Sequence, residues 1–133
     1  MSEAAGLGDQ IGEGRNLRQT SFGPMNVLFY RLGSATALGE PDRAVRLARR
    51  IDPGALPHVE RRVRYWLDVA RALSAAGLDG PALQALLQAE RAAPQEVRSR
   101  DTTQELVVHL LGTSRRIDVA ALRSLARRVG VAA

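Results

Sequence analysis

Two glycines, Gly39 and Gly77, lie 38 residues apart, and each is followed by an alanine five positions later. Around both glycines the apolar residues recur at steps of three and four, the spacing that places side chains on one face of an α-helix. Helix pairs that repeat at such a period bury their apolar faces against their neighbours and form a helical solenoid. The chain is therefore predicted to be all-α, with about six helices in antiparallel pairs.

Proline, glycine and one aspartate mark the expected ends of these helices. Residues 1–20 contain four glycines without a sustained apolar period, which predicts a flexible N-terminal segment. Asp118 is expected to be the N-cap of the last helix. The predicted helices run from Pro24 to Gly39, Pro41 to Asp52, about His58 to Ala76, the Asp79–Pro81 turn to Pro94, roughly 96–112, and Asp118 to Gly130.

The second helix pair contains an ordered pattern of bulky and small residues that ends in a proline: Trp66, Val69, Ala70, Leu73, Gly77, Ala82, Leu86, Ala89 and Pro94. This pattern resembles a tetratricopeptide repeat. Small residues are expected where the two helices approach closely, bulky residues between them, and a proline at the end of the second helix. The resemblance implies a right-handed, tetratricopeptide-like α-solenoid over 21–133, with units of about 25–53, 58–94 and 96–130.

Five longer segments carry a more specific similarity: Thr20–Val27, Ala44–Pro53, Leu67–Ala72, Ala85–Arg98 and Leu122–Gly130. They resemble the C-terminal domain of actinobacterial Cro/cI-type transcriptional regulators. In that family a helix-turn-helix domain precedes the repeat domain, which acts in sensing, dimerisation or partner binding. Only about 20 residues precede the similarity here, so no sequence-specific DNA binding by this chain alone is expected. Tyr30 and Met25 stand where the family usually has histidine and threonine.

Charge and composition exclude several classes of protein. All 19 cationic residues are arginines, and with 14 acidic residues they give a formal charge of +5. The arginines are spread along the chain, which favours solvated helix surfaces over a nucleic-acid site. The chain has no cysteine, and its two histidines, His58 and His109, are far apart, so neither a metal nor a cofactor is predicted. Without a membrane-spanning run or a secretory signal, the expected location is cytoplasmic.

In a tetratricopeptide array the first helix of each pair lines a concave groove. Arginines in such a groove can clamp a carboxylate or phosphate. The alternative is a solvated face on which Asp68 pairs with two arginines, and a partly buried, hydrogen-bonded His109. Trp66 is expected in the core. The predicted groove residues are Asn26, Phe29, Arg64, Leu67, Arg71 and His109.

These features predict a non-enzymatic regulatory or interaction module that binds a protein, peptide or small effector, with homodimerisation left open. The alternative is a small-molecule-binding protein or an enzyme recruited from this fold, with a pocket around Arg64, Arg71 and His109. A third hypothesis is electrostatic DNA binding near the C-terminus. Its residues would be Arg115, Arg116, Arg123, Arg127 and Arg128.

Overall fold

The computed structural model describes residues 23–113 and 118–132, and all of its regular structure is helical. The predicted segment 1–20, and Arg115 and Arg116, lie outside the described residues. The described part has no strand, so the all-α prediction is confirmed. Its elements are α1 (Pro24–Ala37), α2 (Pro41–Arg49), the 3₁₀ turn η2 (Pro53–Ala55), α3 (Val59–Ala75), α4 (Asp79–Ala92), α5 (Pro94–Arg98), α6 (Asp101–Thr113) and α7 (Val119–Val129).

Helix ends follow the predicted signals closely. Gly39, Gly77 and Gly130 adopt positive φ angles of 71°, 80° and 86°, the left-handed conformation that ends many helices. At the start of α7, the Asp118 carboxylate accepts a hydrogen bond of 3.0 Å from the backbone N–H of Ala121. Asp118 is therefore the N-cap of α7, as predicted.

The prediction of one continuous helix over roughly 96–112 is wrong. Pro94 begins the short helix α5 instead of only ending α4, because a proline at the first helical position sacrifices no backbone hydrogen bond. The backbone N–H of Arg100 then bonds to the carbonyl of Val97, which closes the last turn, and α6 starts at Asp101. The described residues thus form seven α-helices where about six were expected.

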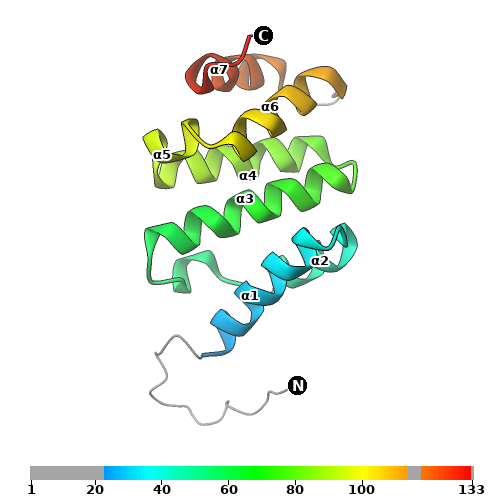
Figure 1. Ribbon diagram of the computed structural model, residues 1–133, viewed down its shortest axis with the longest axis vertical. Helices are drawn as coiled ribbons and strands as arrows, with labels where there is room; N and C mark the ends of the chain where they lie inside the picture. Colours follow the sequence, from blue (N-terminus) through cyan, green and yellow to red (C-terminus); the bar gives the residue numbers. More distant parts are fainter. Residues whose placement is uncertain (1–22, 114–117, 133) are drawn as a thin grey trace.

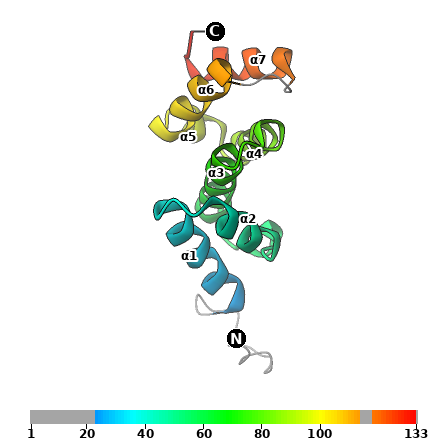
Figure 2. The ribbon, with the colours of Figure 1, turned by 90° about the vertical axis from the view of Figure 1, so that its right-hand side faces the viewer.

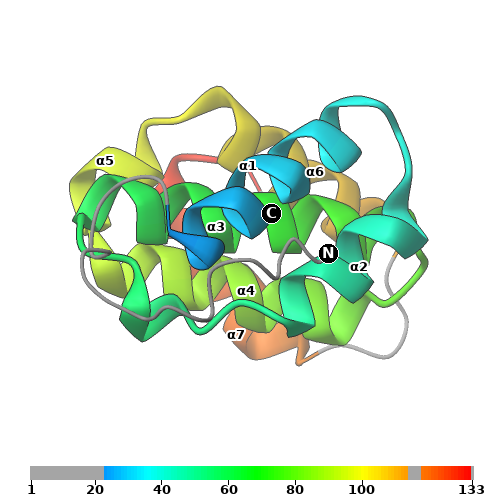
Figure 3. The same cartoon turned by 90° about the horizontal axis from the view of Figure 1, so that it is seen from below.

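The helices are stacked along the long axis of the molecule, with α1 and α2 at one end and α7 at the other (Figure 1). The central helix α3 contacts α1 and α2 on one side and α4 and α6 on the other. A quarter turn shows the same order along the axis, and α7 packs on α6 (Figure 2). Viewed along the axis, the successive layers overlie one another (Figure 3).

Leucine and alanine supply most of the core. Ala70 and Ala82, on α3 and α4, are both fully buried, as the repeat pattern predicts. Trp66 is only half-buried, but it packs against the core and makes an edge-to-face contact with Tyr65 at 4.9 Å between ring centroids. The helical spacing also predicts four further residues on apolar faces, but these are between 44% and 69% exposed: Val27, Leu38, Val59 and Val119.

Glu90 joins three helices near the α7 end. Its buried carboxylate on α4 accepts hydrogen bonds from Arg98 of α5, at 2.9 Å, and from Arg128 of α7, at 2.6 and 2.8 Å. Hydrogen bonds from these guanidinium groups outweigh the effect of burial and lower the pKa of Glu90. The same contacts raise the pKa of Arg128. This charge network fixes α7 to the middle of the molecule.

Two kinds of feature are absent from the described residues. In that part of the chain no helix combines the length and apolar character that a membrane crossing requires. No three histidine, aspartate or glutamate side chains there are grouped so as to hold a metal ion.

Candidate functional site

Four charged residues of α3 form a continuous line along the helix, which we call the α3 stripe: Arg61, Arg64, Asp68 and Arg71. Their spacing of three, four and three residues places all of them on one side of the helix. Arg64 and Arg71 are exposed, Arg61 is half-buried and Asp68 is buried. The stripe therefore presents three cations around one shielded carboxylate.

Asp68 is the unusual member of the stripe. Only 5% of its surface is exposed, and its Oδ2 atom is buried without a hydrogen-bond partner. The neighbouring helix α1 approaches it at Gly33, where an added Cβ atom would lie 3.7 Å from Oδ2. That distance is an ordinary van der Waals contact, so the α1 backbone lies against the carboxylate at Gly33, and this residue has no side chain that could donate to it.

Burial in this setting raises the pKa of the Asp68 carboxyl group, because a charge is less stable away from water. The positive charges of Arg64 and Arg71 act in the opposite direction and lower that pKa, but burial has the larger effect. The prediction that Asp68 lies on a solvated face is therefore wrong. The sequence shows an acid between two arginines but does not show that α1 covers it.

Arg64 and Arg71 act on Asp68 through space. Among the described residues, neither forms a hydrogen bond or an ion pair with Asp68 or with any other side chain. Their guanidinium groups are consequently available to an external anion. A guanidinium presents planar pairs of N–H donors that match the two oxygens of a carboxylate.

Arg61 differs from these two arginines because α1 holds it in place. Its guanidinium donates to Asn26 Oδ1 and, at 3.1 Å, to the hydroxyl of Tyr30. Its Cζ atom lies 5.8 Å from the ring centroid of Phe29 and 5.6 Å from that of Tyr30, within the range of a cation–π contact. Arg61 thus links α1 to α3 and has fewer free donors than Arg64 or Arg71.

Two contacts between α1 and α3 share one sequence offset. Asn26 and Arg61 are 35 residues apart, and so are Gly33 and Asp68. An equal offset at both places means that the two helices run side by side in the same direction. The stripe therefore lies along the junction of α1 and α3.

The predicted site residues do not all lie together. Asn26 and Phe29 meet Arg61 at the start of α1, and Arg64 and Arg71 flank Asp68. Phe29 and Leu67, which are 7% and 3% exposed, lie in the core and not on an open surface, because neighbouring helices cover both side chains.

His109 lies apart from the other predicted site residues. It is exposed on α6, so the alternative expectation that it is partly buried is wrong. Its backbone carbonyl accepts a hydrogen bond from the hydroxyl of Thr113, but no described contact joins its side chain to the arginines. His109 is therefore not part of the α3 stripe.

Sequence reasoning missed Arg61, Tyr30 and Gly33 as parts of the site. Arg61 had a detectable signal, since it lies three residues before Arg64 and seven before Asp68. Gly33 had none, because a glycine inside a helix does not reveal which residue of another helix lies opposite.

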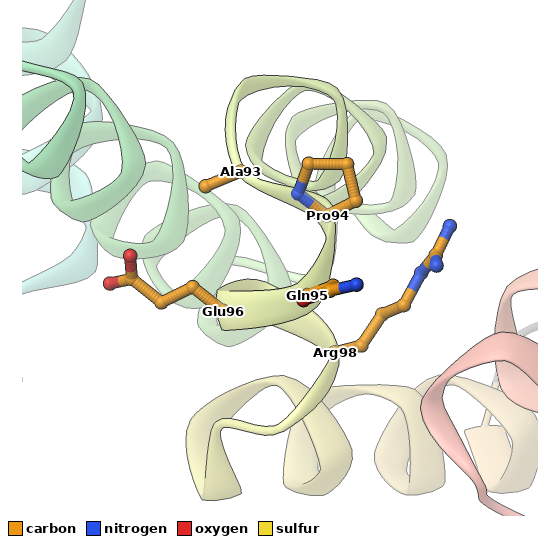
Figure 4. Close-up of a pocket in the computed structure, with 5 residues that line it drawn as sticks. All are labelled: Ala93, Pro94, Gln95, Glu96 and Arg98. Atoms are coloured by element: carbon orange, nitrogen blue, oxygen red, sulfur yellow. The ribbon is translucent and has the colours of Figure 1, made fainter.

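A separate open depression of about 610 Å³ lies where α4 meets α5. Figure 4 shows the residues that line this depression. Among them, Glu96 and Arg98 point to opposite sides of α5. Both charges already have partners, since Glu96 pairs with Arg100 and Arg98 pairs with Glu90. The depression is formed by a single short segment, and none of the predicted site residues lines it.

Comparison with known proteins adds no further assignment. Neither the family models, nor the curated proteins, nor the solved structures contain a match to this chain.

Proposed function

We propose that the chain is a non-enzymatic interaction module that binds an acidic segment of a protein partner along the junction of α1 and α3. On this proposal its helices form a tetratricopeptide-like solenoid, and α1, α3 and α6 are the first helices of successive units. The observation that carries the binding proposal is the α3 stripe, in which Arg64 and Arg71 are exposed and have no partner among the described side chains.

Repeated contacts support the solenoid. In a stacked array, equivalent helices of neighbouring units lie beside each other, separated in sequence by about one repeat. The α1–α3 contacts span 35 residues, and the Glu90–Arg128 contact between α4 and α7 spans 38. The contact between α3 and α6 continues the series of first helices.

Charge supports an acidic partner. The chain carries a formal charge of +5, which attracts acidic surfaces over distances up to about the Debye length, beyond which salt screens the charges. The two arginines project from an exposed helix face, and the depression at α4 and α5 lies apart from them. An open surface suits an extended peptide better than a small molecule, which needs an enclosing pocket.

We also propose kinship with the sensor half of Cro/cI-type regulators. This rests on the segments quoted above, such as Ala44–Pro53 and Leu122–Gly130. In that setting, an acidic segment of another protein would be the regulatory signal that the module receives.

The binding proposal is tested with fluorescein-labelled octaglutamate and fluorescence anisotropy at neutral pH. Removing both free arginines in R64A/R71A is expected to weaken binding at least about tenfold, the equivalent of one strong charged contact. The matched control is R46A/R50A, which removes the exposed Arg46 of α2 and the exposed Arg50 that follows this helix, and so changes the net charge equally. Equal losses in the two double variants, or no loss in R64A/R71A, would overturn the assignment to the α3 stripe.

A further inference from the structure

Asp68 lies between the two arginines proposed to bind the partner, and its position has a consequence for how binding responds to acid. We propose that an anionic partner bound by Arg64 and Arg71 is taken up together with one proton, which Asp68 holds. This inference rests on the proposed function, since it assumes that these arginines contact the partner. It adds the regulation of that site by pH.

The geometry leaves the carboxylate dependent on the arginines. On α1 the residue opposite is Gly33, which offers no donor side chain, and Oδ2 has no hydrogen-bond partner. Among the described residues, Arg64 and Arg71 are the charged groups that act on Asp68, and none on α1, α2, α4 or α6 does so. In the free protein the two cations are the main favourable influence on the ionised form.

A bound anion removes that influence. Its negative charge offsets the attraction between the arginines and Asp68, and it also repels the carboxylate. Both effects favour the protonated carboxyl group, in addition to the burial that already raises its pKa. The pKa of Asp68 is therefore higher in the complex than in the free protein.

The sign of the pH dependence follows from this difference. Between the two pKa values the complex holds one more proton than the free protein, so affinity increases as pH falls through that interval. Coupling to a single proton limits the gain to about tenfold per pH unit. Raising the pH through that interval deprotonates Asp68 and weakens binding of the partner.

The experiment measures the dissociation constant of labelled octaglutamate between about pH 5.5 and pH 8, a range in which glutamate side chains stay largely ionised. The proteins are the wild-type chain, D68N, R64A/R71A and D42N. Asp42 is an exposed aspartate of α2, so D42N removes the same charge away from the α3 stripe. Wild type and D42N should bind more tightly as pH falls, whereas D68N should bind tightly throughout and show little pH dependence.

The two proposals fail in different ways. Absence of octaglutamate binding, or wild-type affinity in R64A/R71A, overturns the proposed function. Arginine-dependent binding with the same pH profile in wild type and D68N overturns the proton coupling alone.

A second measurement does not require D68N to fold. The ¹³C resonance of the Asp68 carboxyl carbon is followed against pH in the wild-type protein, with and without saturating octaglutamate. A higher pKa in the complex supports the proposal, and an unchanged or lower one overturns it.

Discussion

Tyr65 and Tyr30 show how burial decides what the same side chain contributes. The hydroxyl of Tyr65 is buried between α3 and α2 and donates a hydrogen bond of 3.0 Å to the carbonyl of Ala48. Burial, with a smaller contribution from the negative charge of Asp52, raises the pKa of Tyr65. Tyr30 is 57% exposed, and its hydroxyl accepts a hydrogen bond from Arg61 at the surface.

Replacing Tyr65 with phenylalanine should therefore cost more than the same change at Tyr30. Y65F leaves the buried carbonyl of Ala48 without this donor, and we expect the free energy of unfolding to fall by about 1–2 kcal/mol. At Tyr30 water replaces the lost hydroxyl, so Y30F should change it by less than about 0.5 kcal/mol. Urea denaturation followed by circular dichroism measures both. Equal effects would show that the Tyr65 hydrogen bond contributes nothing beyond a solvated one.

At the scale of the helix, Gly77 and Gly112 are expected to have opposite effects on the stability of the protein. Gly77 lies two residues after the end of α3 and has a φ of 80°, whereas Gly112 lies in the last turn of α6. An added Cβ atom would meet no other atom within 4 Å at either place. Space is thus equal, and only backbone conformation distinguishes the two sites.

Alanine at these positions should change stability in opposite directions. G77A forces an L-residue into the left-handed region and should destabilise the protein by about 1–2 kcal/mol. G112A should stabilise it by up to about 1 kcal/mol, because alanine loses less conformational entropy within a helix. Thermal denaturation provides the comparison. A loss of stability in both variants would show that local conformation is not the deciding factor.

Helix ends could be predicted because their signals are local. Gly39, Gly77 and Asp118 act through their own backbone or the next turn, so the sequence alone locates them. The break between α5 and α6 falls at Ser99 and Arg100, and neither is a proline or a glycine that would indicate a helix end in the sequence. Long-range packing decides such positions.

The candidate site was predictable to a smaller extent. Arg64 and Arg71 were identified from their spacing, and both are exposed. That they line a binding groove stays a prediction. The burial of Asp68, Phe29 and Leu67 depends on which helices lie against α1 and α3. Helical periodicity identifies the faces of one helix, but it does not say how many of those faces a neighbour covers.

At the scale of the whole molecule, stability depends on contacts between successive layers. In the proposed solenoid, contacts between distant parts would be few, and each junction would contribute separately. At the α7 end the junction includes Glu90, whose side chain is 9% exposed, and two arginine side chains that are 33% and 38% exposed. The contribution of this junction to the free energy of unfolding should therefore decrease when Glu90 is protonated.

E90Q should lower the free energy of unfolding by about 1–3 kcal/mol at neutral pH, because it removes the charge that both arginines bind. The folded-state pKa of Glu90 is lowered, so this contribution is fully present above the ordinary glutamate pKa. It is lost as pH falls through the lower folded-state value. The difference between wild type and E90Q should accordingly shrink in acid.

Urea denaturation at a series of pH values tests this dependence. The raised pKa of Asp68 has the opposite consequence, because it makes stability decrease as pH rises. Wild type and E90Q both contain Asp68, so this effect cancels in the difference between their free energies of unfolding. The control is E40Q, which breaks the exposed pair between Glu40 and Arg43 and should cost less than about 0.5 kcal/mol. A difference between wild type and E90Q that stays constant in acid would contradict the role of the Glu90 charge in holding α7 on the stack.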